Sequence, residues 1–126
     1  MFHIDNLSRK PVYEQIVDQT ETLILTQTLK PGSPMPSVRS LAVNLSINPN
    51  TIQKAYIELD RKGLIQSVPG KGSFITEKAI EILHSDKRKK LDSFDALIRE
   101  MALAGISEEE LIAHIHEQMK KGDVIQ

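Results

Sequence analysis

Apolar residues recur at helical intervals in two short stretches near the middle of the chain. They stand at positions i, i+3, i+4 and i+7 of each stretch, namely Val38, Leu41, Ala42 and Leu45 in the first and Ile52, Ala55, Tyr56 and Leu59 in the second. This spacing places each set on one face of an α-helix. The pattern therefore predicts two short amphipathic helices, each with one buried side.

The residues that flank these stretches predict where the two helices begin and end. Ser37 is a favoured N-cap residue ahead of the first helix, and Asn48 can cap the second. Pro49 suits the first helical position, where its missing N–H costs nothing, and Gly63 ends the second helix. Residues 46–47 form the turn. Two short helices joined by a tight turn are the plan of a helix-turn-helix, a module that reads DNA.

Two short β-prone runs follow the second helix. Leu64–Val68 and Ser73–Ile75 flank a Pro-Gly-Lys-Gly tip at residues 69–72, which predicts a β-hairpin. Two glycines around a lysine allow the backbone to approach a phosphate or a minor groove closely. A lysine at a hairpin tip can also serve solubility alone. Directly after a predicted recognition helix, the hairpin is better interpreted as a wing.

The buried stripe leaves a polar face on the first turns of the second helix. Asn50, Thr51, Gln53 and Lys54 occupy this outer face. Asn and Gln can bond adenine bidentately, and the Thr methyl group can contact a thymine methyl group. A solvated surface near a helix cap is the alternative interpretation of the same residues. With the hairpin, the set favours DNA reading, with A·T pairs preferred.

Four stretches together resemble the GntR family of bacterial transcription regulators. They are Pro36–Ala42 (PSVRSLA), Asn48–Tyr56 (NPNTIQKAY), Gly63–Ile65 (GLI) and Gly70–Ile75 (GKGSFI). The resemblance runs from about Pro11 to Ile75, and the segment after it is similar to that of the small YtrA-type branch. Other members of the family often carry Arg where Pro49 or Gln53 stands here, so the base preference stays open.

The resemblance implies a winged helix-turn-helix in which both short helices and the wing contact DNA. It places a DNA contact at Arg39 in the first helix and others along the recognition helix, residues 49–62. With the residue chemistry above, the candidate DNA-binding set is Ser37, Arg39, Asn48, Pro49, Asn50, Thr51, Gln53, Lys54, Gly70, Lys71 and Gly72.

A further helix precedes the module. It is predicted from Pro11 to about Leu29, with an apolar stripe that completes the core of the two short helices. The stripe consists of Val12, Tyr13, Ile16, Val17, Leu23 and Ile24. Tyr13 and Tyr56 are interpreted as packing residues. Before this helix, Phe2 and Ile4 alternate like the edge of a strand.

The chain after Thr76 is predicted to form a helical hairpin. One helix spans Glu77–Ala104, Gly105 breaks it, Ser107 begins a capping box, and the second helix ends at Gly122. Its apolar positions are Leu91, Phe94, Leu97, Ile98, Met101, Leu111, Ile112, Ile115 and Met119. So few residues cannot enclose a core, so this surface is expected to form a dimer. The alternative is that this apolar surface docks onto the chain's own DNA module. The basic run at residues 87–90 is interpreted either as a solvated helix face or as a contact to DNA phosphate.

Composition narrows the possible classes of protein. The chain has 126 residues, 40% hydrophobic and 26% charged, and no cysteine. No apolar run is long enough for a membrane span, so a cytoplasmic protein without a membrane partner is expected. Residues 1–76 carry eight Lys/Arg and six Asp/Glu, a net +2, whereas residues 77–126 carry eight against eleven, a net −3. The predicted DNA module is thus the basic part.

Enzymatic chemistry finds little support in the sequence. His114 and His116 are two residues apart, on different sides of a helix, so they do not form an i, i+4 metal pair. No nucleophile–base set, P-loop or dinucleotide glycine pattern is present. We therefore expect no catalytic activity, no metal and no cofactor, and no dedicated domain for a small-molecule effector.

The sequence predicts a mostly α fold with a small β-hairpin wing. Residues 1–76 are expected to form a winged helix-turn-helix DNA-binding domain and residues 77–126 a helical dimerisation segment. The predicted function is a homodimeric regulator, a repressor, of a near-palindromic operator, with residues 69–72 at the minor groove or backbone. A winged helix used for protein–protein contact is the alternative.

Overall fold

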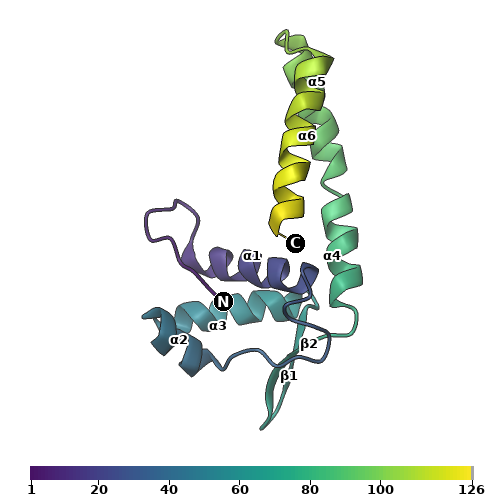
Figure 1. Cartoon of the computed structure of the whole chain (residues 1–126). Coiled ribbons are helices and arrows are strands. Elements are labelled where there is room, and N and C mark those ends of the chain that lie inside the picture. Colours follow the sequence, from purple (N-terminus) through teal and green to yellow (C-terminus); the bar gives the residue numbers. More distant parts are fainter. Residues whose placement is uncertain (126) are drawn as a thin grey trace. The chain divides into compact units, whose positions relative to one another are not determined.

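A computed structural model describes residues 1–125, with side chains through Gly122. Its elements, in chain order, are α1 (Val12–Leu25), α2 (Val38–Leu45), α3 (Pro49–Arg61), β1 (Ile65–Val68), β2 (Gly72–Ile75), α4 (Ala79–Arg88), α5 (Leu91–Leu103) and α6 (Glu108–Ile125) (Figure 1). The chain divides into two compact units, Met1–His84 and Ser85–Gln126. The mostly α fold with a two-stranded hairpin confirms the predicted fold class.

The core of the first unit forms where α1 and α2 pack on α3. All four residues of the predicted stripe on α3 are buried, whereas only the middle two of the α2 stripe are. The apolar residues that the core buries are Ile16, Val17, Ile24, Leu29, Met35, Leu41, Ala42, Ile52, Ala55, Tyr56, Leu59, Leu64, Ile65, Ile75, Ala79 and Leu83. The helical periodicity of the sequence thus placed the buried faces of the module correctly.

The first turns of α4 also belong to this core. Ala79 and Leu83 are fully buried in the same cluster as the helices of the module. The compact units accordingly divide after His84, later than the expected boundary after Thr76. The first two turns of α4 are therefore structural parts of the first unit.

The hairpin gains a third extended segment from the loop before α2. β1 and β2 are antiparallel, with Ser67 paired with Ser73. Along the other edge of β2, the Gly32 N–H donates to the Ile75 carbonyl and the Met35 N–H to the Ser73 carbonyl, both at 2.8 Å. The wing is therefore fastened to the loop that leads into α2.

The N-terminal segment is not a strand, and two glutamines of α1 bind its backbone instead. The Gln19 side chain accepts a hydrogen bond from the His3 N–H at 2.8 Å and donates one to the His3 carbonyl. Gln15, a buried residue, does the same with Asp5 at 2.9 and 3.0 Å. The side chains of Phe2 and Ile4 then pack against the core.

Three predicted helix boundaries were wrong. α1 ends at Leu25 rather than near Leu29, because Gln27 takes a left-handed conformation and folds the chain back. The expected helix Glu77–Ala104 is interrupted at residues 89–90, where a turn separates α4 from α5. The last helix continues through Gly122 to Ile125, since a glycine inside a helix is tolerated at a cost of about 1 kcal/mol.

The second unit holds α5 and α6. Gly105, with φ +90°, makes the break between them as predicted, and the Ser107 hydroxyl accepts the Glu110 N–H at 3.1 Å as the N-terminal cap of α6. No residue of 91–122 is buried within the single chain. Within the part of the chain that the structure describes, no helix is long and apolar enough to span a membrane.

Candidate nucleic-acid interface

The start of α2 is fixed by the predicted cap. The Ser37 hydroxyl accepts a hydrogen bond from the Ser40 N–H at 3.0 Å, which satisfies one of the free donors of the first turn. Arg39 is exposed in that turn. The side chain of Ser37 is therefore occupied by the helix, while the guanidinium of Arg39 faces solvent.

The turn and the start of the recognition helix α3 also follow the prediction. Ser46 takes a left-handed conformation at φ +55°, and the half-buried Ile47 fills the turn. The Asn48 carboxamide accepts the Asn50 N–H at 2.8 Å, and Pro49 occupies the first helical position. Both helix caps of the helix-turn-helix are thus confirmed.

The outer face of α3 carries the predicted polar set. Asn50 and Gln53 are exposed, and Thr51 is half-buried. Lys54 is exposed as well, but its ammonium lies 4.1 Å from the centre of the Tyr13 ring, on the side of the helix that faces α1. A cation over an aromatic ring is attracted by its π-electrons. Lys54 is therefore held beside α1, whereas Asn50 and Gln53 are free to meet a ligand.

The wing tip is a tight turn that requires glycine. The Lys71 N–H donates to the Val68 carbonyl at 2.9 Å, and Gly70 lies at φ +76°. Proline followed by a residue of positive φ is the pattern of a type II turn. Gly72 follows at φ +109°, and the whole tip is exposed. The ammonium of Lys71 therefore projects from a stiff, narrow hairpin.

A groove of about 440 Å³ joins the elements of the candidate interface. It lies among the first residue of α2, the outer face of α3 and the facing strands of the wing. Its lining consists of Val38, Gln53, Tyr56, Ile57, Asp60, Arg61, Ser67 and Ser73. The structure thus brings the predicted Gln53 next to the wing.

Sequence reasoning missed much of this groove. Ile57, Asp60, Arg61, Ser67 and Ser73 were not in the predicted set, although the first of them is 60% exposed. The signal was present in the spacing, because Ile57 stands four residues after Gln53 and Arg61 another four. Positions that far apart share a helix face.

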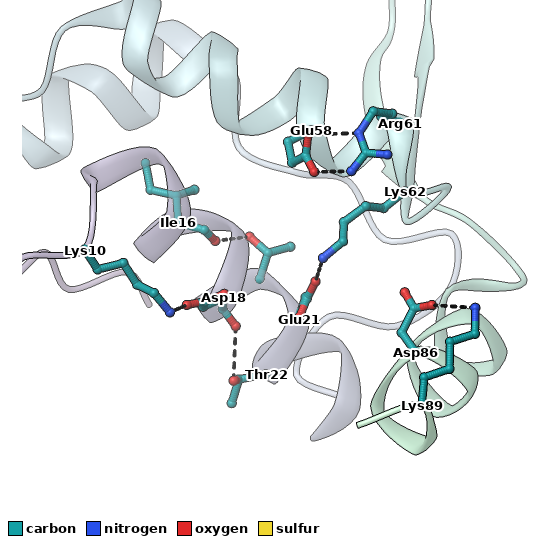
Figure 2. A network of polar contacts seen from close by, with 11 residues as sticks. Lys10, Ile16, Asp18, Glu21, Thr22, Glu58, Arg61, Lys62, Asp86 and Lys89 are labelled. Atoms are coloured by element: carbon teal, nitrogen blue, oxygen red, sulfur yellow. Dashed lines mark hydrogen bonds and ion pairs between the residues drawn. The ribbon is translucent and has the colours of Figure 1, made fainter. Parts of the chain in front are cut away.

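The cations of this surface differ in their pairing. Arg61 donates from Nε to the Glu58 carboxylate at 3.0 Å and from a second nitrogen to its other oxygen, and Lys62 binds Glu21 (Figure 2). The hydrogen bond from Arg61 lowers the pKa of Glu58. Among the described residues, Arg39 and Lys71 form no ion pair. Their positive charges are therefore available to an anionic partner such as DNA phosphate.

The predicted dimerisation residues lie on α5 and α6. An apolar hollow of about 550 Å³ is lined by Phe94, Ile98, Met101, Ile106, Leu111, Ile115 and Met119, with Glu110, His114 and Gln118 beside them. Leu91, Leu97 and Ile112 do not line it, although each is at least 44% exposed. Among the described residues, no cluster of three His, Cys, Asp or Glu is placed to hold a metal ion.

Capped helices in a helix-turn-helix arrangement, followed by a hairpin beside the recognition helix, define a winged helix-turn-helix, a DNA-binding class of protein. The model of the family "Bacterial regulatory proteins, gntR family" matches residues 12–75. The chain belongs to the GntR family of DNA-binding transcription regulators.

Known proteins resemble the chain over nearly its whole length. The HTH-type transcriptional repressor YtrA of Bacillus subtilis is 40% identical over 96% of this chain and 91% of its own. A solved GntR family transcriptional regulator from Listeria monocytogenes shares 40% identity and a TM-score of 0.73, covering 90% of this chain and 98% of its own. The predicted YtrA-type relationship is thereby confirmed.

A solved protein–DNA complex contains a domain that is similar to the DNA-binding part of this chain. The DNA-binding domain of AraR, in complex with operator ORX1, is 27% identical with a TM-score of 0.53 over 60% of this chain and 93% of its own. The family is a class of regulatory proteins, which is not a class of enzymes.

Proposed function

We propose that the chain is a homodimeric repressor that binds a near-palindromic operator, with α3 in the major groove and the wing tip at the minor groove or backbone. The observation that carries this proposal is the groove that joins the start of α2, the outer face of α3 and the wing. One DNA duplex can meet all three elements at once only if they border one surface. The AraR domain, which shares this part of the fold, was solved in complex with an operator, and this supports operator binding by the first unit.

The chemistry of the surface suits DNA better than a protein partner. The exposed side chains at the helix start and wing tip are amides and unpaired cations, namely Arg39, Asn50, Gln53 and Lys71. A protein-binding face would present a contiguous apolar patch. Ile57 is the large apolar side chain that α3 exposes, and one such residue does not form a patch.

The proposal that the protein acts as a dimeric repressor is supported by the second unit and by the similarity to known repressors. α5 has no buried residue, although its apolar positions have the regular spacing of a buried stripe. An amphipathic helix contributes stability by burying that stripe. A second copy offers the same surface and gives two recognition helices for two half-sites. The similarity to the repressor YtrA of Bacillus subtilis extends over nearly the whole chain, which supports repression as the effect of DNA binding.

A binding selection tests the DNA proposal. The full chain is incubated with random duplexes, the enriched duplex is measured against a scrambled one, and each affinity is followed over a salt series. We expect a two-fold symmetric site, and an affinity that falls steeply with salt as phosphate contacts release counterions. Arg39→Ala and Gln53→Ala should each weaken specific binding by about 1–3 kcal/mol. Arg9→Ala, at an exposed arginine outside this surface, is the control. Equal affinity of the wild-type chain for both duplexes would refute the proposal.

Sedimentation tests the dimer separately. Ile115→Glu places a carboxylate in the apolar hollow, and we expect it to convert the dimer into a monomer. Leu103→Glu is the matched control, because Leu103 is 91% exposed and lies outside the hollow. Dissociation by both substitutions, or by neither, would contradict the assignment of this surface.

A further inference from the structure

The loop before α2 contacts each DNA-facing element of the first unit. We name residues 32–37 the junction segment. Gly32 and Met35 donate backbone hydrogen bonds to β2, and the Ser33 carbonyl accepts one from Ile75 at 2.9 Å. At its other end, Ser37 caps α2. The backbone of the junction segment is therefore shared by the wing and the first helix of the module.

The recognition helix reaches the same segment through one side chain. The Tyr56 hydroxyl donates a hydrogen bond of 2.6 Å to the Pro36 carbonyl, the residue directly before the Ser37 cap. Tyr56 is 5% exposed, so water competes little for this bond. Tyr56 also lines the groove between α3 and the wing. One hydroxyl thus connects α3 to the point where the wing-bound loop becomes α2.

We propose that Tyr56 is a positioning residue for DNA binding, and that its hydroxyl sets where Arg39 and the wing lie relative to α3. The inference rests on the proposed function, because it concerns the placement of the DNA contacts. Pro36 has no backbone N–H. Among the hydrogen bonds of the described residues, its carbonyl accepts one, from the Tyr56 hydroxyl. Loss of the hydroxyl would free the end of the junction segment nearest Arg39. The helix caps and the core would remain.

A positioning role and a purely stabilising role predict different results. Partial unfolding lowers the affinity for every duplex by the same factor, so the ratio of specific to non-specific affinity is unchanged. Displacement of Arg39 and the wing instead weakens the specific complex more, and it lowers the salt dependence because fewer phosphates are contacted. The specificity ratio and the salt slope therefore separate the two roles even if the variant is less stable.

The test compares Tyr56→Phe with the wild-type full chain on the duplex enriched from the random pool and on a scrambled duplex. Phenylalanine keeps the ring and removes the hydroxyl. Tyr13→Phe is the matched control, because its hydroxyl bonds Glu14 on its own helix. We expect Tyr56→Phe to lower the specificity ratio about five- to tenfold, which lies within the usual range for one hydrogen bond, with a shallower salt slope. Tyr13→Phe should leave both unchanged.

A second comparison tests whether Tyr56 acts through Arg39. In an Arg39→Ala background, the further loss from Tyr56→Phe should fall below about twofold, because the contact it positions is already absent. An unchanged specificity ratio in Tyr56→Phe, or a full loss that persists in the Arg39→Ala background, would overturn the inference. If the wild-type chain does not distinguish the two duplexes, the proposed function itself fails. The two failures are therefore distinguishable.

Discussion

The ammonium of Lys62 binds the carboxylate of Glu21, so the end of the recognition helix is joined to α1 (Figure 2). The Glu21 side chain is 5% exposed and that of Lys62 is 28% exposed. Lys62 is also the C-cap residue of α3, where a positive charge is favourable to the helix dipole. The pair therefore fixes α3 at the end opposite to its first turns, which we propose to read DNA.

Removal of the Lys62 charge should destabilise the fold. A buried carboxylate deprived of the ammonium that it contacts is costly, and because Lys62 is partly exposed we expect Lys62→Met to lose about 2 kcal/mol of unfolding free energy. Urea denaturation measures this loss. Lys10→Met is the control, since Lys10 and Asp18 form a pair that is about half exposed on both sides. A similar small change in both variants would show that burial adds nothing to the pair.

Two substitutions of the cap residue Ser37 should distinguish an effect on helix stability from an effect on DNA contact. Ser37→Ala removes the acceptor for the Ser40 N–H and should cost about 1 kcal/mol of stability. Ser37→Asp should restore that stability, because Asp is an equally good cap. It also places a negative charge beside Arg39, so its DNA affinity should fall below that of Ser37→Ala. Thermal unfolding and binding to the enriched duplex are measured on the same samples. Higher affinity in the Asp variant would exclude DNA from this helix end.

Local signals made the helix-turn-helix predictable. The buried stripes of α2 and α3, both caps and the Gly63 stop depend on residues within a turn or two of each other. The left-handed Gln27, which ends α1 early, has no such signal, because glutamine is not a residue type that marks a positive φ. Local sequence patterns therefore predicted the module well and the length of α1 poorly.

Long-range polar contacts were not predictable. The Tyr56 hydroxyl bonds a carbonyl 20 residues away, Gln19 binds backbone 16 residues away, and Lys62 pairs with an acid 41 residues away. Each requires the relative placement of two elements, which periodicity does not supply. The groove residues Ile57 and Arg61 were missed for a similar reason, since the proximity of the wing became visible only in three dimensions.

Substitution of Gly63 by alanine should destabilise the fold more than the same substitution of Gly70. Both take left-handed conformations, at φ +82° and +76°, so alanine is strained at either position by about 1 kcal/mol. A Cβ atom at Gly63 would also meet the Ile82 side chain at 3.1 Å, whereas a Cβ at Gly70 would have no described atom within 4 Å beyond Gly70 itself and its two chain neighbours. We expect Gly63→Ala to lose about 2 kcal/mol and Gly70→Ala about 1 kcal/mol in urea denaturation. An equal loss would mean that Ile82 moves aside freely.

Tyr56 should make the fold sensitive to alkaline pH. Burial raises the pKa of Tyr56 from 10.0 to about 12. Between these values the unfolded chain has lost the phenol proton while the folded chain keeps it, so ionisation favours unfolding. The stability that Tyr56 contributes is therefore complete below pH 10 and is lost as the pH rises toward 12. The full loss is about 2–3 kcal/mol, at 1.36 kcal/mol for each pKa unit.

Urea denaturation at pH 9, 10 and 11 measures this effect as the difference between Tyr56→Phe and the wild-type chain. Lysine deprotonation is common to both proteins and cancels in that difference. We expect the wild-type chain to lose more stability than the variant between pH 10 and 11, by about a third of the full amount. Tyr13→Phe is the control, because the pKa of Tyr13 is also raised, but mainly by its hydrogen bond to Glu14 rather than by burial. Parallel curves for wild type and Tyr56→Phe would show that the Tyr56 phenol is solvated in the folded protein.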